Sequence, residues 1–186
     1  MKKTALLLAA LLGAASAYAQ TIKLQTSEGD IRIELDAEKA PKTVANFVQY
    51  VKAGHYSGTI FHRVIDGFMI QGGGFDAKLV QKPTKAPIPL ESHNGLSNLR
   101  GTIAMARTGV PNSATSQFFI NVVDNQRLDG EADNPASGYA VFGRVIEGME
   151  VVDKIRAVEV SNQGALQNVP VKPITITKAL IEPVKK

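Results

Sequence analysis

The sequence predicts a mainly β protein: a closed antiparallel β-barrel of about eight strands, capped by two α-helices. Many short segments rich in Ile, Val and Phe are separated by Gly, Pro, Asn and Asp, which is typical of strands joined by turns. Only two segments have helical spacing, whereas a doubly wound α/β sheet needs a helix between most strands. Many short strands with two helices favour a closed barrel whose ends the helices cover.

The first third of the chain begins with a hairpin and continues into a helix. Over 21–35, apolar residues alternate with polar ones on both sides of a turn at 27–30, which predicts two paired strands. Pro41 suits a helix start and Gly54 a helix end. Between them, apolar residues recur at helical spacing, at Val44, Phe47, Val48 and Val51.

The rest of the chain returns to strands, with one short helix near its end. Residues 74–101 and 124–138 are long and irregular, and loops of this length in a compact domain are usually functional or mobile. They are therefore candidate walls of a binding site. No linker or internal repeat interrupts the pattern. The remaining predicted elements are strands at 59–65, 68–71, 102–106, 117–123 and 139–145, a helix at 148–156 and a last strand at 173–182.

The N-terminus has the pattern of a secretory signal peptide. Two lysines precede an apolar run over 5–15, and Ala-Tyr-Ala at 17–19 fits the small-x-small cleavage pattern. A membrane anchor is the alternative, but a spanning helix needs about 20 apolar residues. We expect residues 1–19 to be removed, which leaves 20–186 as a single domain without a membrane anchor.

Composition excludes several kinds of chemistry. Without the first 19 residues, 19 basic residues remain of 21 against 17 acidic ones, so the formal charge falls from +4 to +2. These charges are scattered, which argues against a nucleic-acid partner. The absence of cysteine excludes a disulfide framework and a thiolate nucleophile. The three histidines lack metal-ligand spacing, so we expect no metal and no cofactor.

The densest group of polar residues in an apolar context lies at 61–73, Phe-His-Arg-Val-Ile-Asp-Gly-Phe-Met-Ile-Gln-Gly-Gly. An arginine in such a strand needs partners or a polar cleft, so Arg63 is either a structural ion-pair residue or a site residue. His62 is as easily a packed structural histidine, since neighbours on a strand face opposite sides. The glycines at 72–74 lack the lysine of a phosphate loop, and tight backbone packing explains them.

This segment resembles the signature of the cyclophilins, and three later segments match further motifs of that family in the same order and spacing. The resemblance covers nearly the whole chain after the first 19 residues, and with the signal peptide it is similar to the bacterial periplasmic rotamase A type. The matching segments are Gly-Thr-Ile-Ala-Met-Ala at 101–106, Ser-Gln-Phe-Phe-Ile at 116–120, and Val-Phe-Gly-Arg-Val at 141–145 followed by Glu147 and Gly148.

The resemblance implies an eight-stranded barrel with two capping helices and a peptide groove on its outer face. It implies a peptidyl-prolyl cis–trans isomerase, with Arg63 as the catalytic arginine. The residues implied to line the proline pocket are Phe68, Met69, Phe119 and Leu128; those beside the peptide are Gln71, Ala106, Arg107 and Gln117; and Tyr139 stands where many eukaryotic members have histidine.

The chemistry of proline isomerisation fits a chain without cysteine or cofactor. Amide resonance opposes rotation with a barrier of about 18–20 kcal/mol, and no bond has to break. A guanidinium can donate a hydrogen bond to the proline nitrogen, whose lone pair is free only in the twisted amide. The alternative is a non-catalytic module that binds or holds proline peptides on the same barrel, although a pure binder has less need of Arg63.

The expected partners are proline-containing segments of unfolded or exported proteins, and the expected location is the periplasm. No obvious apolar surface helix is present, so a monomer is expected. The chain departs from the family at Arg127, where eukaryotic members commonly have the tryptophan associated with cyclosporin binding, so we expect weak affinity for that drug. The stretch between Leu128 and Tyr139 is also longer than in eukaryotic members, and its Glu131, Asp133 and Pro135 are candidates for reshaping the groove rim.

Overall fold

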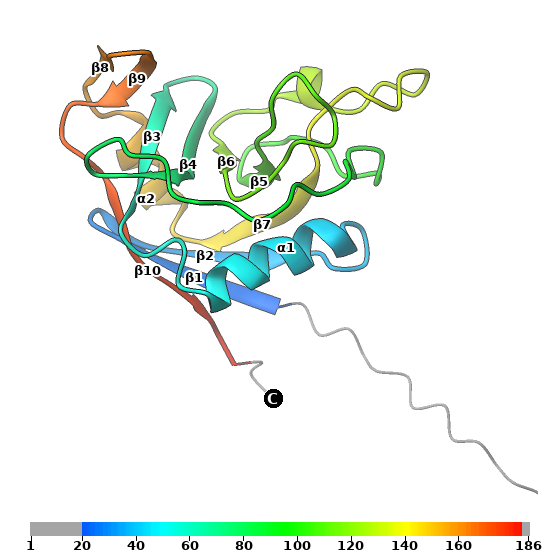
Figure 1. Cartoon of the computed structure of the whole chain (residues 1–186), viewed down its shortest axis with the longest axis horizontal. Helices are drawn as coiled ribbons and strands as arrows, with labels where there is room; N and C mark the ends of the chain where they lie inside the picture. Colours follow the sequence, from blue (N-terminus) through cyan, green and yellow to red (C-terminus); the bar gives the residue numbers. More distant parts are fainter. Residues whose placement is uncertain (1–19, 184–186) are drawn as a thin grey trace, which may run out of the picture.

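The computed structural model describes residues 20–183 and confirms the closed antiparallel barrel with two helices (Figure 1). The predicted signal peptide at 1–19 lies outside the described residues. Eight strands close the barrel in the order β1-β10-β3-β4-β6-β5-β7-β2. The strands are β1 Gln20–Thr26, β2 Gly29–Leu35, β3 Thr59–Ile65, β4 Met69–Asp76, β5 Thr102–Met105, β6 Phe118–Asn121, β7 Val141–Glu147 and β10 Thr175–Ile181.

Side-chain alternation along the strands fills the inside of the barrel. In β1, Ile22 and Leu24 are fully buried while their neighbours are only partly buried, and β2 repeats this pattern. At the centre, the ring of Phe118 meets those of Phe47 and Tyr56 edge-on, each at a centroid distance of 5.5 Å. First and last strands lie side by side, with Ile22 opposite Ile181 (Figure 1). Pairing of β1 with β10 therefore closes the barrel.

The two helices begin and end as the sequence predicts. Helix α1, Pro41–Lys52, starts at its proline, and Gly54 follows it with a φ of 68° that few other residues adopt. Its apolar face packs into the core beside β10. Helix α2, Met149–Arg156, buries Val151, Val152 and Ile155 next to β2, β3 and β4. Within the described residues, no helix is long and apolar enough to cross a membrane.

The structure adds elements that the sequence analysis missed. Two short strands, β8 Val160–Gln163 and β9 Leu166–Pro170, form a separate hairpin outside the barrel. Most of its residues are exposed or partly exposed, so it lacks the alternation of apolar and polar residues that marks a half-buried strand. The predicted irregular stretch 74–101 was wrong at its start, because 74–76 continue β4. The stretch 124–138 includes a short 3₁₀ helix, Gln126–Leu128.

Candidate active site

A second apolar cluster, distinct from the core, lies on the barrel at β4, β5, β6 and β7. We call it the outer cluster. Its floor consists of four buried side chains, and its rim consists of partly buried ones that leave apolar surface in contact with water. Open apolar surface of this kind marks binding sites more often than structural packing. The floor residues are Met69, Ala104, Phe119 and Val141; the rim residues are Ile65, Phe68, Leu96, Ala106, Leu128 and Tyr139.

A bulge in β3 places Arg63 beside this cluster. Phe61 pairs with Gly72 and Arg63 with Gln71, so two residues of β3 stand opposite one residue of β4. The regular alternation of faces is broken at this point, so the expectation that His62 and Arg63 must face opposite sides does not apply. Gln71 in turn pairs with Phe119 of the cluster floor. One strand, β4, therefore lies between Arg63 and Phe119, and that strand itself supplies the floor residue Met69.

Two glutamines orient the guanidinium. Arg63 Nη1 donates to Gln71 Oε1 at 3.4 Å, and Gln71 Nε2 donates to Gln117 Oε1 at 2.9 Å. Arg63 has no carboxylate partner among the described residues, whereas other arginines such as Arg144 do. Its remaining N–H groups are thus available to a ligand. A Cβ at Gly74 would lie only 2.5 Å from the Gln117 side chain, which confirms that tight packing explains this glycine.

His62 is buried, at 4% exposure, with its ring centroid 4.7 Å from that of Phe75. Burial lowers the pKa of His62 to about 4, and the positive charge of Arg63 acts in the same direction. Its Nδ1 has no hydrogen-bond partner among residues 20–183. A neutral histidine next to Arg63 adds no competing positive charge to the site.

Leu128 and Tyr139 are held together at the two ends of the 129–138 loop. The Tyr139 N–H donates to the Leu128 carbonyl at 2.9 Å. The Asp129 carboxylate accepts hydrogen bonds from the Asn98 backbone N–H at 2.7 Å and from Asn98 Nδ2 at 2.8 Å. The loop therefore leaves the site at Leu128 and returns to it at Tyr139, and the two rim residues lie next to each other.

Arg107 holds this loop from the other side. Its Nε donates to the Gly138 carbonyl at 2.9 Å and its Nη2 to the Ala136 carbonyl at 3.3 Å. The guanidinium also lies 4.9 Å from the centroid of the Tyr139 ring, and the rings of Tyr139 and Phe119 meet nearly perpendicularly at 5.6 Å. The predicted groove residue Arg107 thus uses its side chain to position the Tyr139 part of the rim.

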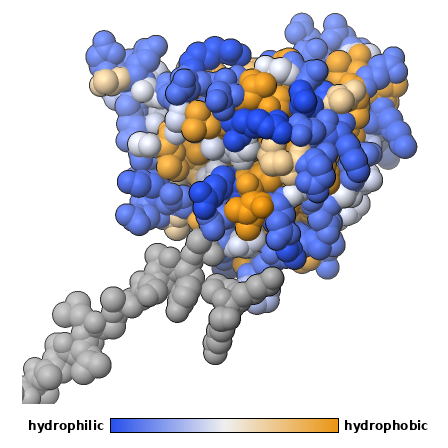
Figure 2. Space-filling model, turned by 180° about the vertical axis from the view of Figure 1, so that it is seen from behind, coloured by the Kyte–Doolittle hydropathy of each residue, from blue (hydrophilic) through white to orange (hydrophobic). Residues whose placement is uncertain are grey.

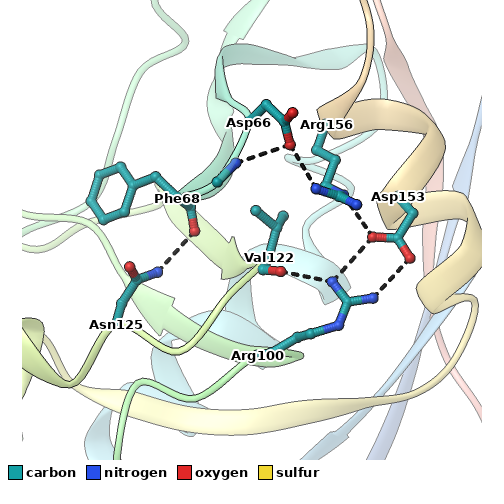
Figure 3. Close-up of polar contacts among 8 residues, drawn as sticks. Asp66, Phe68, Arg100, Val122, Asn125, Asp153 and Arg156 are labelled. Carbon is teal, nitrogen blue, oxygen red and sulfur yellow. Dashed lines mark hydrogen bonds and ion pairs between the residues drawn. The ribbon is translucent and has the colours of Figure 1, made fainter.

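The Phe68 part of the rim is fixed through its backbone (Figure 3). The Phe68 carbonyl accepts hydrogen bonds from the Val122 N–H at 3.1 Å and from Asn125 Nδ2 at 2.8 Å. The Arg127 guanidinium lies 4.8 Å from the Phe68 ring centroid, at the position where the family resemblance implied tryptophan. Phe68 therefore has a fixed backbone and a ring covered on one side by an exposed arginine.

The structure brings the candidate residues together and adds others. Phe68, Met69, Ala106, Phe119, Leu128 and Tyr139 all belong to the outer cluster, with Arg63, Gln71 and Gln117 beside it and Arg107 behind Tyr139. Sequence reasoning missed Ala104, Val141, Leu96 and Asn125. Ala104 and Val141 lie within apolar strands and carry no signal of their own. Asn125 is a buried amide in a predicted loop, and only its partners show its role.

Two cavities lie away from Arg63, and the larger one shares Leu96 and Val141 with the outer cluster. One, of about 940 Å³, lies between β2, the 95–102 segment and β7, and another, of about 790 Å³, lies beside α1. Neither is lined by Arg63 or by the glutamines beside it. No cluster of three or more potential metal ligands occurs in the described part of the chain. The outer cluster next to a free guanidinium is therefore the best candidate site.

A closed barrel with an open apolar cluster and an adjacent guanidinium defines a site for a mostly apolar ligand that needs one strong hydrogen-bond donor. Comparison with known protein families shows which family has this fold and this kind of site. Residues 21–181 match the family described as "Cyclophilin type peptidyl-prolyl cis-trans isomerase/CLD". The chain therefore belongs to the cyclophilin-type peptidyl-prolyl cis–trans isomerases, and its activity is rotation about the peptide bond that precedes proline.

Individual relatives agree with this assignment. The chain is 59% identical over 161 residues to peptidyl-prolyl cis-trans isomerase A of Dickeya dadantii, covering 86% of this chain and 83% of that protein. It is 51% identical over 161 residues to isomerase B of Escherichia coli, covering 86% and 98%. The structure of a Cryptosporidium parvum cyclophilin type isomerase matches with a TM-score of 0.75 at 29% identity, covering 90% of this chain and all of that one.

Proposed function

We propose that the outer cluster binds the proline ring of the substrate and that Arg63 is the catalytic residue. The observation that carries this proposal is the position of Arg63: beside open apolar surface, oriented by Gln71, and without a carboxylate partner in the described chain. A structure of the C. parvum protein was obtained in the presence of the dipeptide Ala-Pro, at a TM-score of 0.73 and 29% identity to this chain. Proline-containing segments are therefore the substrates we infer here.

Arg63 acts on the twisted amide. In the planar ground state, resonance engages the nitrogen lone pair, and rotation frees it. A charged N–H donor near that nitrogen stabilises the twisted state more than the planar one, and only such differential stabilisation increases the rate. Gln71 fixes the guanidinium, so little reorganisation is needed during the reaction.

The outer cluster holds one side of the rotating bond. A proline ring has no charge and no N–H, so an apolar floor such as Met69 and Phe119 suits it. With the ring held against the floor, the residue before proline turns on the solvent side. No covalent intermediate, metal or cofactor is required by this chemistry.

The physiological role we propose is to assist the folding of exported proteins in the periplasm. The signal-peptide pattern at 1–19 supports export, and proline isomerisation is slow enough to limit folding. On the face seen in Figure 2, hydrophobic residues lie in small groups among hydrophilic ones, and this supports the monomer that we propose. N-terminal sequencing of protein from a periplasmic extract should begin at Gln20; retention of Met1 would contradict export with cleavage.

Isomerisation of a short Ala-Pro peptide tests the role of Arg63. We expect Arg63→Ala to lower kcat/KM by roughly two to three orders of magnitude, the usual effect of removing a transition-state donor. Arg63→Lys keeps the charge but loses the planar donor geometry, so we expect it to recover only part of the rate. Circular dichroism and Tm should show that both variants remain folded.

A matched control removes a different arginine. Arg144→Ala breaks the exposed pair with Glu34, whose N–O distance is 2.7 Å, and it should leave kcat/KM unchanged. If folded Arg63→Ala retained the wild-type rate, Arg63 would not be the catalytic residue. An Arg63→Ala variant that still suppressed aggregation of unfolded proteins would separate holding from isomerisation.

A further inference from the structure

The turn between β3 and β4 carries Phe68, and side chains from distant parts of the chain surround it (Figure 3). The Phe68 N–H donates to the Ile65 carbonyl at 3.1 Å, and Gly67 between them has a φ of 71°. This is the geometry of a four-residue turn with glycine at its third position. Asp66 is the second residue of the turn, and its Oδ1 accepts the Gly67 N–H at 2.9 Å.

One connection to this turn comes from helix α2. Arg156 Nη1 donates to Asp66 Oδ1 at 2.7 Å, while its Nε donates to Asp153 Oδ1 at 2.8 Å. The guanidinium therefore spans from the helix to the turn. Its side chain is 34% exposed and that of Asp66 is 66% exposed, so neither is part of the core.

A second connection reaches Phe68 itself. Arg100 binds Asp153 through two hydrogen bonds, Nη2 to Oδ2 at 2.8 Å and Nη1 to Oδ1 at 3.1 Å. The same Nη1 donates to the Val122 carbonyl at 2.7 Å, and the Val122 N–H donates to the Phe68 carbonyl at 3.1 Å. Arg100 thus holds the backbone of Val122, which in turn holds the backbone of Phe68.

Both connections meet at Asp153, whose carboxylate accepts three hydrogen bonds from two guanidinium groups. The hydrogen bond from Arg100 is the main cause that lowers the pKa of Asp153 below its ordinary value. Such bidentate geometry is stronger and more directional than a single exposed ion pair. Asp153 therefore couples two residues of the turn, Asp66 and Phe68, to helix α2.

We propose that Arg100, Asp153 and Arg156, together with Asp66, are positioning residues that hold the Phe68 rim of the outer cluster in the conformation that binds proline. We call these four residues the brace. The inference rests on the proposed function, because it takes Phe68 as a wall of the proline site. The brace touches no reacting atom. It acts by keeping the turn ordered, so that binding does not have to order it.

Peptide binding and exchange by NMR distinguish this role from a purely structural one. We expect Arg156→Met to raise the Kd of an Ala-Pro peptide about threefold to tenfold and to change the exchange rate of bound peptide less than about twofold. An exposed ion pair contributes little to stability, so Tm should change little. Added salt screens ion pairs and should weaken binding more in the wild type than in Arg156→Met.

A second variant and a control complete the test. Asp66→Asn removes the same ion pair from the side of the turn. Because both substitutions remove one interaction, the Kd of the double variant Asp66→Asn with Arg156→Met should be no higher than that of the single variant with the higher Kd. Arg144→Met breaks the comparable exposed pair with Glu34 and should leave Kd unchanged. Unchanged Kd in Arg156→Met and Asp66→Asn would overturn the brace, and so would an equal effect of Arg144→Met. A wild type whose Phe68 ring resonances do not respond to the peptide would instead contradict the proposed function.

Discussion

The two faces of strand β6 place adjacent phenylalanines in opposite environments. Phe118 is fully buried in the barrel and surrounded by the rings of Phe47, Tyr56 and Phe61. Phe119, the next residue, lies in the floor of the outer cluster, and among the aromatic rings of residues 20–183 it meets only that of Tyr139. The inner face is closed by the barrel, whereas the outer face ends at a partly exposed rim. The same kind of side chain therefore contributes to the core on one face and, in the function we propose, to binding on the other.

Arg63 and its glutamines strengthen this difference. Gln71 pairs directly with Phe119 in the β4–β6 register, and its side chain donates to Gln117, so polar side chains lie beside the floor at Phe119. Apolar surface next to a free charged donor is costly to maintain in a purely structural role. The contrast teaches that burial alone would have classed both phenylalanines as core.

The largest expected effect is on the inner face. Phe118→Ala removes a fully buried ring from between three aromatic neighbours, so we expect a loss of about 3–5 kcal/mol in the free energy of unfolding. Urea denaturation measures this loss. A loss below about 1 kcal/mol would mean that the interior is not packed as described.

The burial of His62 should make the free energy of unfolding depend on pH. Its pKa is near 6.5 in the unfolded chain and about 4 in the folded one, so the unfolded state binds a proton first as the pH falls. Stability from this group is present above pH 6.5 and declines between about 6.5 and 4, by up to about 3 kcal/mol.

His62→Gln provides the control for this effect. The variant lacks the titrating ring, so its stability should decline less over the same pH interval, as measured by denaturation at several pH values. Carboxylates such as Asp153, whose pKa is lowered, lose their stabilising effect only as the pH falls through the acid range, and they do so in both proteins. Parallel pH curves for wild type and variant would contradict a buried, neutral His62.

The outer face should respond in activity more than in stability. Phe119→Ala opens the cluster floor beside an existing opening, so we expect a smaller loss than for Phe118→Ala, about 1–2 kcal/mol. Since we propose that the floor holds the proline ring, kcat/KM should fall at least about tenfold. The comparison would fail if Phe119→Ala were as destabilising as Phe118→Ala while activity stayed at the wild-type level.

The smallest expected effect concerns the rim at Arg127. We expect cyclosporin to bind weakly, because an exposed arginine over Phe68 stands where the family resemblance implies tryptophan. Arg127→Trp supplies a large aromatic surface and should tighten binding about tenfold without changing turnover of the Ala-Pro peptide. Isothermal titration calorimetry measures both affinities. A nanomolar Kd of cyclosporin for the wild-type protein would contradict the expected weak binding.

The sequence was sufficient for the barrel because most of its strands carry an apolar inner face. It was insufficient for β8 and β9, whose residues are largely exposed on both faces and lack a period of two. In the candidate site, motif resemblance singled out Arg63, Phe119 and the rim, which the fold brings together, while composition alone would have assigned Phe119 to the core. The bulge at His62 could not be foreseen, because it depends on pairing with β4.

Contacts between distant segments were also beyond the sequence. Arg100, Asp153 and Arg156 look like ordinary surface charges when read along the chain, and only the fold brings them to the turn that carries Phe68. The same holds for Arg107, whose guanidinium turns toward the backbone of the 129–138 loop. The sequence shows which residues carry charge, but only the fold shows which groups they contact.

A crystal structure of the protein with an Ala-Pro peptide tests the central claim most directly. We expect the proline ring to lie on the floor formed by Met69 and Phe119, with an Arg63 nitrogen within about 3 Å of the prolyl amide. Binding in the cavity between β2 and β7, or an Arg63 side chain turned away from the peptide, would contradict it.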